Sequence, residues 1–147
     1  MSGGLVGLKH GEFDREIIGV FYSVYNELGY GFLESVYEES LAIALREAGL
    51  SIELRVPVPV WFHGQNVGQF RADILVSASV LLELKNARDL EWGGHEAQLL
   101  HHLRSTEIEN GLLLNFGPRP EFRRLLFNNE REKIRVNLCK SVARISA

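Results

Sequence analysis

Two segments near the start of the chain space their apolar residues as amphipathic helices do. In the first segment the intervals are three and four residues, the period of one helix side; the positions are Phe13, Ile17, Phe21, Val24 and Leu28. Gly29 and Gly31 follow, and glycine readily adopts the backbone conformation found at helix ends. A second helix is predicted from about Leu33 to Ala48, with Gly49 just past its end.

The pattern then changes to the two-residue alternation of β-strands. Apolar residues alternate with others over residues 52–62, where Pro57 and Pro59 favour a sheet edge because proline has no N–H to donate to a second neighbour. A turn is predicted at residues 63–66, followed by a strand over about 67–76. Another strand, residues 80–85, begins after only three residues, and this spacing predicts a β-hairpin.

Helical spacing returns after residues 86–94, and this third helix is predicted to end near residue 105. Residues 111–116 read GLLLNF, a continuous apolar run that is typical of a central strand covered on both faces. A last strand is predicted over residues 122–127. No repeat or Pro/Ser-rich linker interrupts residues 1–127, which we expect to form a single domain.

Residues 128–147 differ from that domain in charge. Five basic residues against two acidic ones make this C-terminal tail basic, although the whole chain has a net charge of −3. The apolar residues of the tail suit either a helix or a strand. The tail could contact a phosphate backbone or cover an apolar surface.

Composition excludes several classes of protein. The 147 residues are 46% hydrophobic, as in one ordinary globular domain, and the negative net charge excludes a protein that coats nucleic acid through bulk positive charge. A single cysteine, Cys139, excludes an internal disulfide and a cysteine-based zinc site. The sequence has no signal-peptide pattern and no apolar run long enough to span a bilayer, so we expect a cytoplasmic protein with no membrane partner.

The hairpin predicted over residues 67–85 brings candidate chemistry together. If its turn is centred on Ala78, Asp73 lies opposite Glu83, and Lys85 projects from the same face. Two carboxylates about 5 Å apart repel each other unless a cation lies between them, and such oxygen ligands suit Mg²⁺ or Mn²⁺. Alternatively, Glu83 and Lys85 form an ordinary exposed ion pair. The apolar context LLELK favours the metal site, because burying polar residues there without a purpose would be costly.

A metal at this position would polarise a phosphodiester and activate water for hydrolysis. Lys85 could orient or deprotonate the attacking water, or neutralise charge on the phosphoryl oxygens, and the sequence leaves these roles open. Glu34, at the start of the second helix, could add a third carboxylate. Gln98 on the third helix could position water or phosphate.

Five motifs in a fixed order resemble a known family. They are GFLESVY (31–37), RADILV (71–76), LLELK (81–85), HEAQLLHHL (95–103) and GLLLNFG (111–117). Together they resemble the GxxExxY protein family, a small branch of the PD-(D/E)xK nuclease superfamily, over about residues 12–127. The resemblance implies an α/β fold with a central mixed β-sheet flanked by helices.

The resemblance also implies roles for single residues. Asp73, Glu83 and Lys85 match the D and ExK positions of the superfamily. Glu34 matches the acidic residue of its first core helix. The carbonyl of Leu84 would be a further metal ligand.

The third helix carries further candidates. Gln98 matches the glutamine of a Q-x-x-x-Y motif found in the recombination-exonuclease branch, and His102 replaces its tyrosine, so a substrate contact through His102 is a weaker expectation. His95, His101 and His102 lack the i, i+4 spacing of helical zinc pairs, which favours hydrogen-bonding or surface roles. Trp92, predicted in a Gly-rich loop, could stack on a base, although packing explains it more simply.

These observations predict a metal-dependent nuclease that hydrolyses phosphodiester bonds in nucleic acid, with DNA as the expected substrate and Mg²⁺ or Mn²⁺ as cofactor. The alternative is a non-catalytic oligomeric scaffold or nucleic-acid-binding protein that retains the nuclease fold, which the negative charge of residues 1–127 favours. A homo-oligomer is expected in either case, because a small chain with an exposed sheet edge can self-associate.

Overall fold

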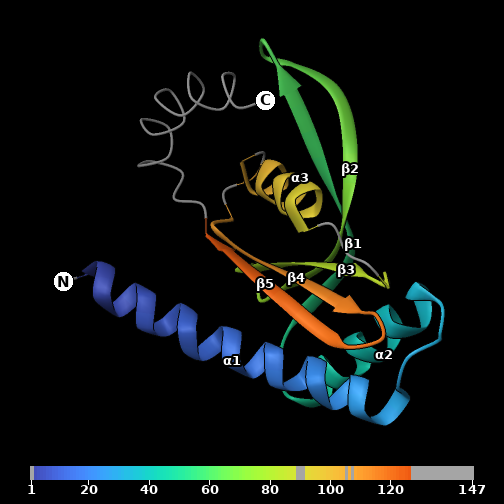
Figure 1. Ribbon diagram of the computed structural model, residues 1–147. Helices are drawn as coiled ribbons and strands as arrows, with labels where there is room; N and C mark the ends of the chain where they lie inside the picture. The colour runs from blue at the N-terminus through green and yellow to red at the C-terminus, as the bar shows by residue number, and fades with distance from the viewer. Residues whose placement is uncertain (1, 89–91, 105, 107, 127–147) are drawn as a thin grey trace.

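The computed structural model describes residues 2–88, 92–104, 106 and 108–126, and the basic tail predicted at 128–147 lies outside them. The elements follow in the order α1 (Ser2–Leu28), α2 (Glu34–Glu47), β1 (Ile52–Phe62), β2 (Gln65–Val76), β3 (Val80–Lys85), α3 (Trp92–Arg104), β4 (Asn110–Phe116) and β5 (Pro120–Leu126). The strands form one sheet in the order β1-β2-β3-β4-β5, with β3 and β4 parallel and the other neighbours antiparallel. Helices α1 and α2 cover one face and α3 covers the other (Figure 1). The expected mixed sheet flanked by helices is confirmed.

The apolar residues with helical spacing near the start of the chain help to form the first core cluster, which lies between the sheet and the helices α1 and α2. Phe21 of α1, Tyr37 of α2 and Phe116 of β4 are fully buried in it. The ring of Phe116 stacks on Tyr37 with centroids 4.4 Å apart and meets Phe21 edge-on at 4.8 Å. Aromatic pairs in these arrangements stabilise beyond their buried area, so the cluster fixes α2, including its first residue, Glu34, against the sheet. None of the described helices is long and apolar enough to cross a membrane.

Strand β4 is buried along its whole length, as the run GLLLNF predicts. Leu112 and Leu114 belong to the first core cluster. Leu113 points to the other face, where it joins Leu99 and Leu103 of α3 in a second core cluster. Fully burying one such side chain contributes about 1.5–3 kcal/mol, so β4 holds the two helical layers on one sheet.

Strands β1 and β2 form a long hairpin. β1 lies at the sheet edge, as its prolines predict. The turn consists of His63 and Gly64 alone, with φ of 50° and 75°, and two consecutive positive φ values are typical of the type I′ turns that join two strands tightly. The predicted four-residue turn is therefore wrong, because Gln65 and Asn66 already belong to β2. The end of this hairpin projects beyond α3 and the rest of the sheet (Figure 1).

The hairpin rotates about its long axis at Arg55, which has a φ of 51°. Leu54 packs against the first core cluster, whereas Val56 packs against the second. On β2, likewise, Ile74 belongs to the first core cluster and Ala72 to the second. Residues two apart in a regular strand share a face, so the ribbon has turned between them, and Asp73 lies at that point of β2.

Candidate active site

The hairpin between β2 and β3 has the predicted turn, centred on Ala78. In this register Asp73 would pair with Glu83, but the last pair of the backbone ladder is Ile74 with Leu82. Instead, the Oδ2 atom of Asp73 accepts a hydrogen bond of 2.7 Å from the backbone N–H of Leu84. The carboxylate of Asp73 therefore lies against the peptide that joins Glu83 to Leu84.

Glu83 is buried, and its carboxylate has a partner on α3. Only 6% of Glu83 is exposed, and its Oε1 lies 2.9 Å from Nδ1 of His102, which is equally buried. The ring of His102 stacks on Phe70 of β2 with centroids 3.5 Å apart. His102 thus links α3 to β3 and β2 inside the protein, and its predicted contact with a substrate stays a prediction.

Asp73 binds its proton far more tightly than an ordinary aspartate. The pKa of Asp73 is raised to about 7, first because burial disfavours the charged form. The negative charges of Glu83, Glu34 and Glu38 raise the pKa further, while the hydrogen bond from the N–H of Leu84 lowers it. Near neutral pH this carboxyl group is therefore balanced between its neutral and its charged form.

Glu34 and Lys85 lie within electrostatic range of these groups. Burial raises the pKa of Glu34, and the positive charge of Lys85 opposes that rise, while Glu38 and Glu83 add to it. Lys85 is half-buried and follows Glu83 by two residues on β3, so both side chains project from the same face of the strand. Asp73, Glu83, Glu34 and Lys85, all predicted from the sequence, thus come from α2, β2 and β3 to one region.

Glu38, one helical turn after Glu34 on α2, belongs to the same region and was not predicted from the sequence. Its Oε1 is buried and has no hydrogen-bond partner in the described part of the chain. It lies 3.7 Å from the Nε of Arg55, which is close enough for an ion pair but too far for a hydrogen bond. The i, i+4 spacing of Glu34 and Glu38 is the signal that could have found it, because residues so spaced share a helix face. We name Asp73, Glu83, Glu34 and Glu38 the carboxylate cluster.

Gln98 and Trp92 both lie on α3, in different surroundings. Gln98 is exposed and lies one turn before His102. Trp92 is the first residue of the helix, so its predicted place in a Gly-rich loop is wrong. Trp92 packs against the second core cluster, with the guanidinium of Arg123 4.9 Å from its ring centroid, and this packing outweighs the low helix propensity of the glycines that follow. Substrate contacts by Gln98 or Trp92 stay predictions.

Two carboxylates of the cluster offer the kind of oxygen ligand that a hard divalent cation takes. Mg²⁺ is typically held by one or two carboxylates, with water and substrate phosphates completing its shell, and Asp73 and Glu83 supply two. Among residues 2–88, 92–104, 106 and 108–126, no group of three or more His, Cys, Asp or Glu side chains is arranged to hold a metal ion. A bound cation would offset the repulsion within the cluster.

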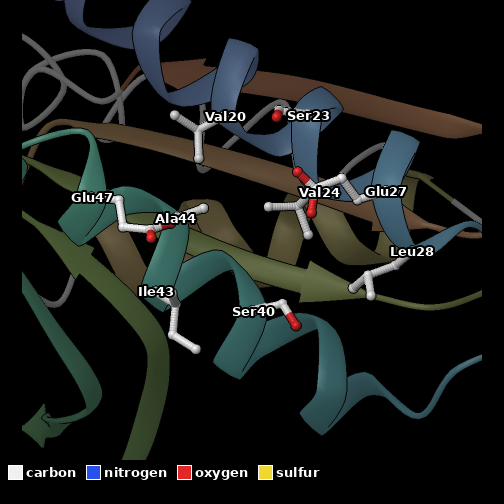
Figure 2. Close-up of a pocket in the computed structure, with 9 residues that line it drawn as sticks. All are labelled: Val20, Ser23, Val24, Glu27, Leu28, Ser40, Ile43, Ala44 and Glu47. Atoms are coloured by element: carbon white, nitrogen blue, oxygen red, sulfur yellow. The ribbon is translucent and has the colours of Figure 1, made fainter.

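A pocket of about 360 Å³ lies elsewhere, between α1 and α2 (Figure 2). Apolar side chains such as Val24 and Ile43 line it together with Ser23, Ser40 and the carboxylates of Glu27 and Glu47. None of the residues predicted for catalysis or metal binding lines this pocket. The candidate chemistry therefore belongs to the carboxylate cluster, not to this cavity.

A solved structure with an unlike sequence shares this fold. The crystal structure of SSO0001 has a TM-score of 0.51 and 20% identity, and the match covers 74% of this chain and 57% of that one. An alkaline exonuclease (LHK-Exo) from Laribacter hongkongensis has a TM-score of 0.41 and 14% identity, covering 71% of this chain and 62% of that one. This chain thus spans little more than half of SSO0001, whose likeness bears on the fold alone. No curated protein matches the chain.

A protein-family comparison identifies the chain more directly. The family model of the PD-(D/E)XK nuclease superfamily matches residues 11–125, which is most of the chain. The matched range contains the whole carboxylate cluster, Lys85 and α3. The chain therefore belongs to the PD-(D/E)XK nuclease superfamily.

Proposed function

We propose that this chain is a metal-dependent nuclease that hydrolyses phosphodiester bonds in DNA, with Mg²⁺ or Mn²⁺ as its cofactor. The observation that carries the proposal is the convergence of Asp73 and Glu83 where the β2–β3 ladder ends, with Lys85 on the same strand as Glu83. Membership of the superfamily supports it. The motif beginning at Gly31 favours the GxxExxY branch.

Asp73 and Glu83 would hold the metal, with the carbonyl of Leu84 and the carboxylate of Glu34 as further ligands. When bound, the cation would polarise the phosphodiester and lower the pKa of a water molecule. Lys85 would orient the attacking water or neutralise the charge that develops on the phosphoryl oxygens. The hydrogen bond from the N–H of Leu84 keeps the carboxylate of Asp73 in place before the substrate arrives.

The proposal extends to the surroundings of the cluster. Gln98, exposed on α3, offers an amide to water or phosphate. Self-association through an exposed sheet edge and a cytoplasmic location complete the proposal.

Cleavage assays on single-stranded DNA, duplex DNA and RNA with Mg²⁺, Mn²⁺ or EDTA test this function. We expect metal-dependent cleavage of DNA, reduced about 100-fold or more in Glu83→Gln and in Lys85→Ala, because removing one electrostatic contact to a transition state typically costs that much. Glu53→Gln is the matched control, since Glu53 is an exposed carboxylate on β1 outside the cluster. It should cleave as the wild type does.

Other outcomes decide against the nuclease. Binding of nucleic acid without cleavage would favour the second candidate, a non-catalytic scaffold or nucleic-acid-binding protein. The contact between Glu83 and His102 favours that candidate, because it occupies one carboxylate oxygen of a proposed ligand. Equal cleavage by the wild type and by folded Glu83→Gln and Lys85→Ala would remove the catalytic roles of Glu83 and Lys85.

A further inference from the structure

The outer part of the β1–β2 hairpin contributes to neither the first core cluster nor the carboxylate cluster. We name residues 56–72 the hairpin arm, the part of the ribbon beyond the rotation at Arg55 and Asp73. Every residue from 61 to 69 is exposed, and the arm projects past α3 into solvent (Figure 1). The base of the arm packs on the second core cluster, but residues 61–69 bury little apolar surface, so this end of the arm is available for a function beyond packing.

The end of the arm exposes large aromatic side chains. Trp61 is 60% exposed and Phe62 is 62% exposed, and the ring of Phe62 lies 4.1 Å from that of His63. Trp61 and Phe62 are neighbours along β1, so their side chains leave opposite faces of the strand, and each face of the tip offers an exposed ring. Flat exposed rings are also the surfaces on which unpaired nucleobases stack.

The charge of the arm complements a polyanion. The arm, residues 56–72, contains no aspartate or glutamate and one arginine, Arg71, in a chain whose net charge is −3. Arg71 is exposed on β2. The arm can therefore approach phosphates without the repulsion that the rest of the acidic chain would impose.

The arm is less suited to binding a second copy of the chain than to binding a polyanion. Pro57 and Pro59 remove N–H donors from the free edge of β1, and edge prolines oppose strand addition. The register between β1 and β2 also shifts between Val60 and Trp61, and a bulge there twists the edge away from a flat partner.

We propose that the hairpin arm binds the unpaired bases of a single-stranded DNA segment by stacking on Trp61 and Phe62. This inference rests on the proposed function, because it makes the bound segment part of the strand that reaches the carboxylate cluster. Strand β2 runs from the tip directly to Asp73. The eight residue-to-residue steps from Gln65 to Asp73 span about 26 Å, or about eight nucleotides at stacked spacing.

The base of the arm is fixed relative to the carboxylate cluster. Phe70 stacks on His102, and His102 contacts Glu83. Val58 and Ala72 are buried in the second core cluster. A strand held at the tip would therefore be held in a defined relation to the cluster.

Binding measured in EDTA tests the arm without cleavage. Fluorescence anisotropy of a labelled single-stranded DNA of about 20 nucleotides should show roughly 5- to 150-fold weaker binding for Trp61→Ala, the range found when stacking residues are removed. Trp61→Phe keeps an aromatic face and should bind almost as the wild type does. Ile43→Ala, which removes an exposed apolar side chain of α2, is the matched control and should bind as the wild type does.

Fluorescence of Trp61 itself gives a second readout. In Trp92→Phe the remaining tryptophan is Trp61, and single-stranded DNA should quench it while a blunt duplex should not. A trinucleotide, too short to span from tip to cluster, should be cleaved equally by the wild type and Trp61→Ala.

Three results would overturn the role of the arm. They are equal DNA binding by the wild type and Trp61→Ala, Trp61-dependent binding of RNA with no binding of DNA, and an oligomer that Trp61→Ala dissociates in sedimentation, which would assign the tip to a second copy. Failure of the proposed nuclease function can be told apart from failure of the arm's proposed role. Trp61-dependent DNA binding without cleavage under any metal would support DNA binding by the arm and reject only catalysis.

Discussion

Asp73 is held where its own charge is unfavourable. Its pKa of about 7 in the folded protein compares with an ordinary value of 3.8. The folded state therefore binds this proton more tightly than the unfolded state, and deprotonation favours unfolding. The resulting loss of stability is absent below pH 3.8, grows as the pH rises between 3.8 and 7, and is complete above 7.

Asp73→Asn should accordingly stabilise the protein at alkaline pH in the absence of divalent cations. Asparagine cannot ionise, and its side-chain oxygen can still accept the hydrogen bond from the N–H of Leu84. We expect a gain on the order of 1–2 kcal/mol in the free energy of unfolding at pH 8, after allowing for the solvent screening of a partly exposed group. Urea unfolding at pH 8 and pH 4 measures it, and the gain should vanish at pH 4.

Two results would contradict this account of Asp73. One is a gain of equal size at both pH values, which would assign the effect to packing and not to ionisation. The other is the same pH-dependent gain in Glu53→Gln, an exposed carboxylate on β1, which would assign it to the overall negative charge.

His102 connects three elements, since it lies on α3, contacts Glu83 of β3 and stacks on Phe70 of β2. Replacing it with alanine leaves a buried carboxylate without its partner, and such losses cost about 1–3 kcal/mol. We therefore expect His102→Ala to lower the free energy of unfolding by that amount, measured from the urea midpoint at pH 7.

His102→Asn separates the two contacts of this side chain. An asparagine amide can still donate to Glu83 but cannot stack on Phe70, so this variant should recover part of the stability that alanine loses. If asparagine is no better than alanine, the stacking on Phe70 stabilises the protein and the contact with Glu83 does not.

The elements that the sequence predicted best are those whose signals are local. The β2–β3 hairpin follows from two apolar runs and a three-residue gap, and its turn is centred on Ala78 as predicted. β4 follows from one uninterrupted apolar run. The start of α3 was predicted wrongly because packing of Trp92 against the second core cluster and Arg123 overrides local propensity.

The parts of the candidate site that the sequence did not indicate depend on contacts between distant residues. The positive φ of Arg55, which turns the arm at Asp73, is unusual for a residue with a side chain. Arg55 is held there by Glu39, to which it donates a 2.8 Å hydrogen bond, and by Glu38 at 3.7 Å. No pattern within β1 records these partners on α2, and the same is true of the contact between His102 and Glu83.

In the whole molecule, the carboxylate cluster lies where separately stabilised parts meet. Glu34 and Glu38 come from α2, which the first core cluster fixes. Asp73 and Glu83 come from adjacent strands, and the partner of Glu83 is on α3, which the second core cluster fixes. Each part is stable through its own apolar contacts, so the repulsion among the carboxylates is tolerated and does not separate them.

A divalent cation would join these parts in the folded state alone, and this predicts stabilisation by metal without any substrate. Binding at tenfold excess over the dissociation constant adds about 1.4 kcal/mol to the free energy of unfolding, which raises the Tm of a protein of this size by about 3–6 °C. We expect this rise with Mn²⁺ at pH 8 in the wild type and in Glu53→Gln, and its reversal by EDTA. Asp73→Ala should abolish the rise even if its own Tm without metal is higher, since it removes the repulsion together with the ligand. The informative quantity is therefore the difference that Mn²⁺ makes within each variant, and an equal rise in Asp73→Ala would locate the cation outside the carboxylate cluster.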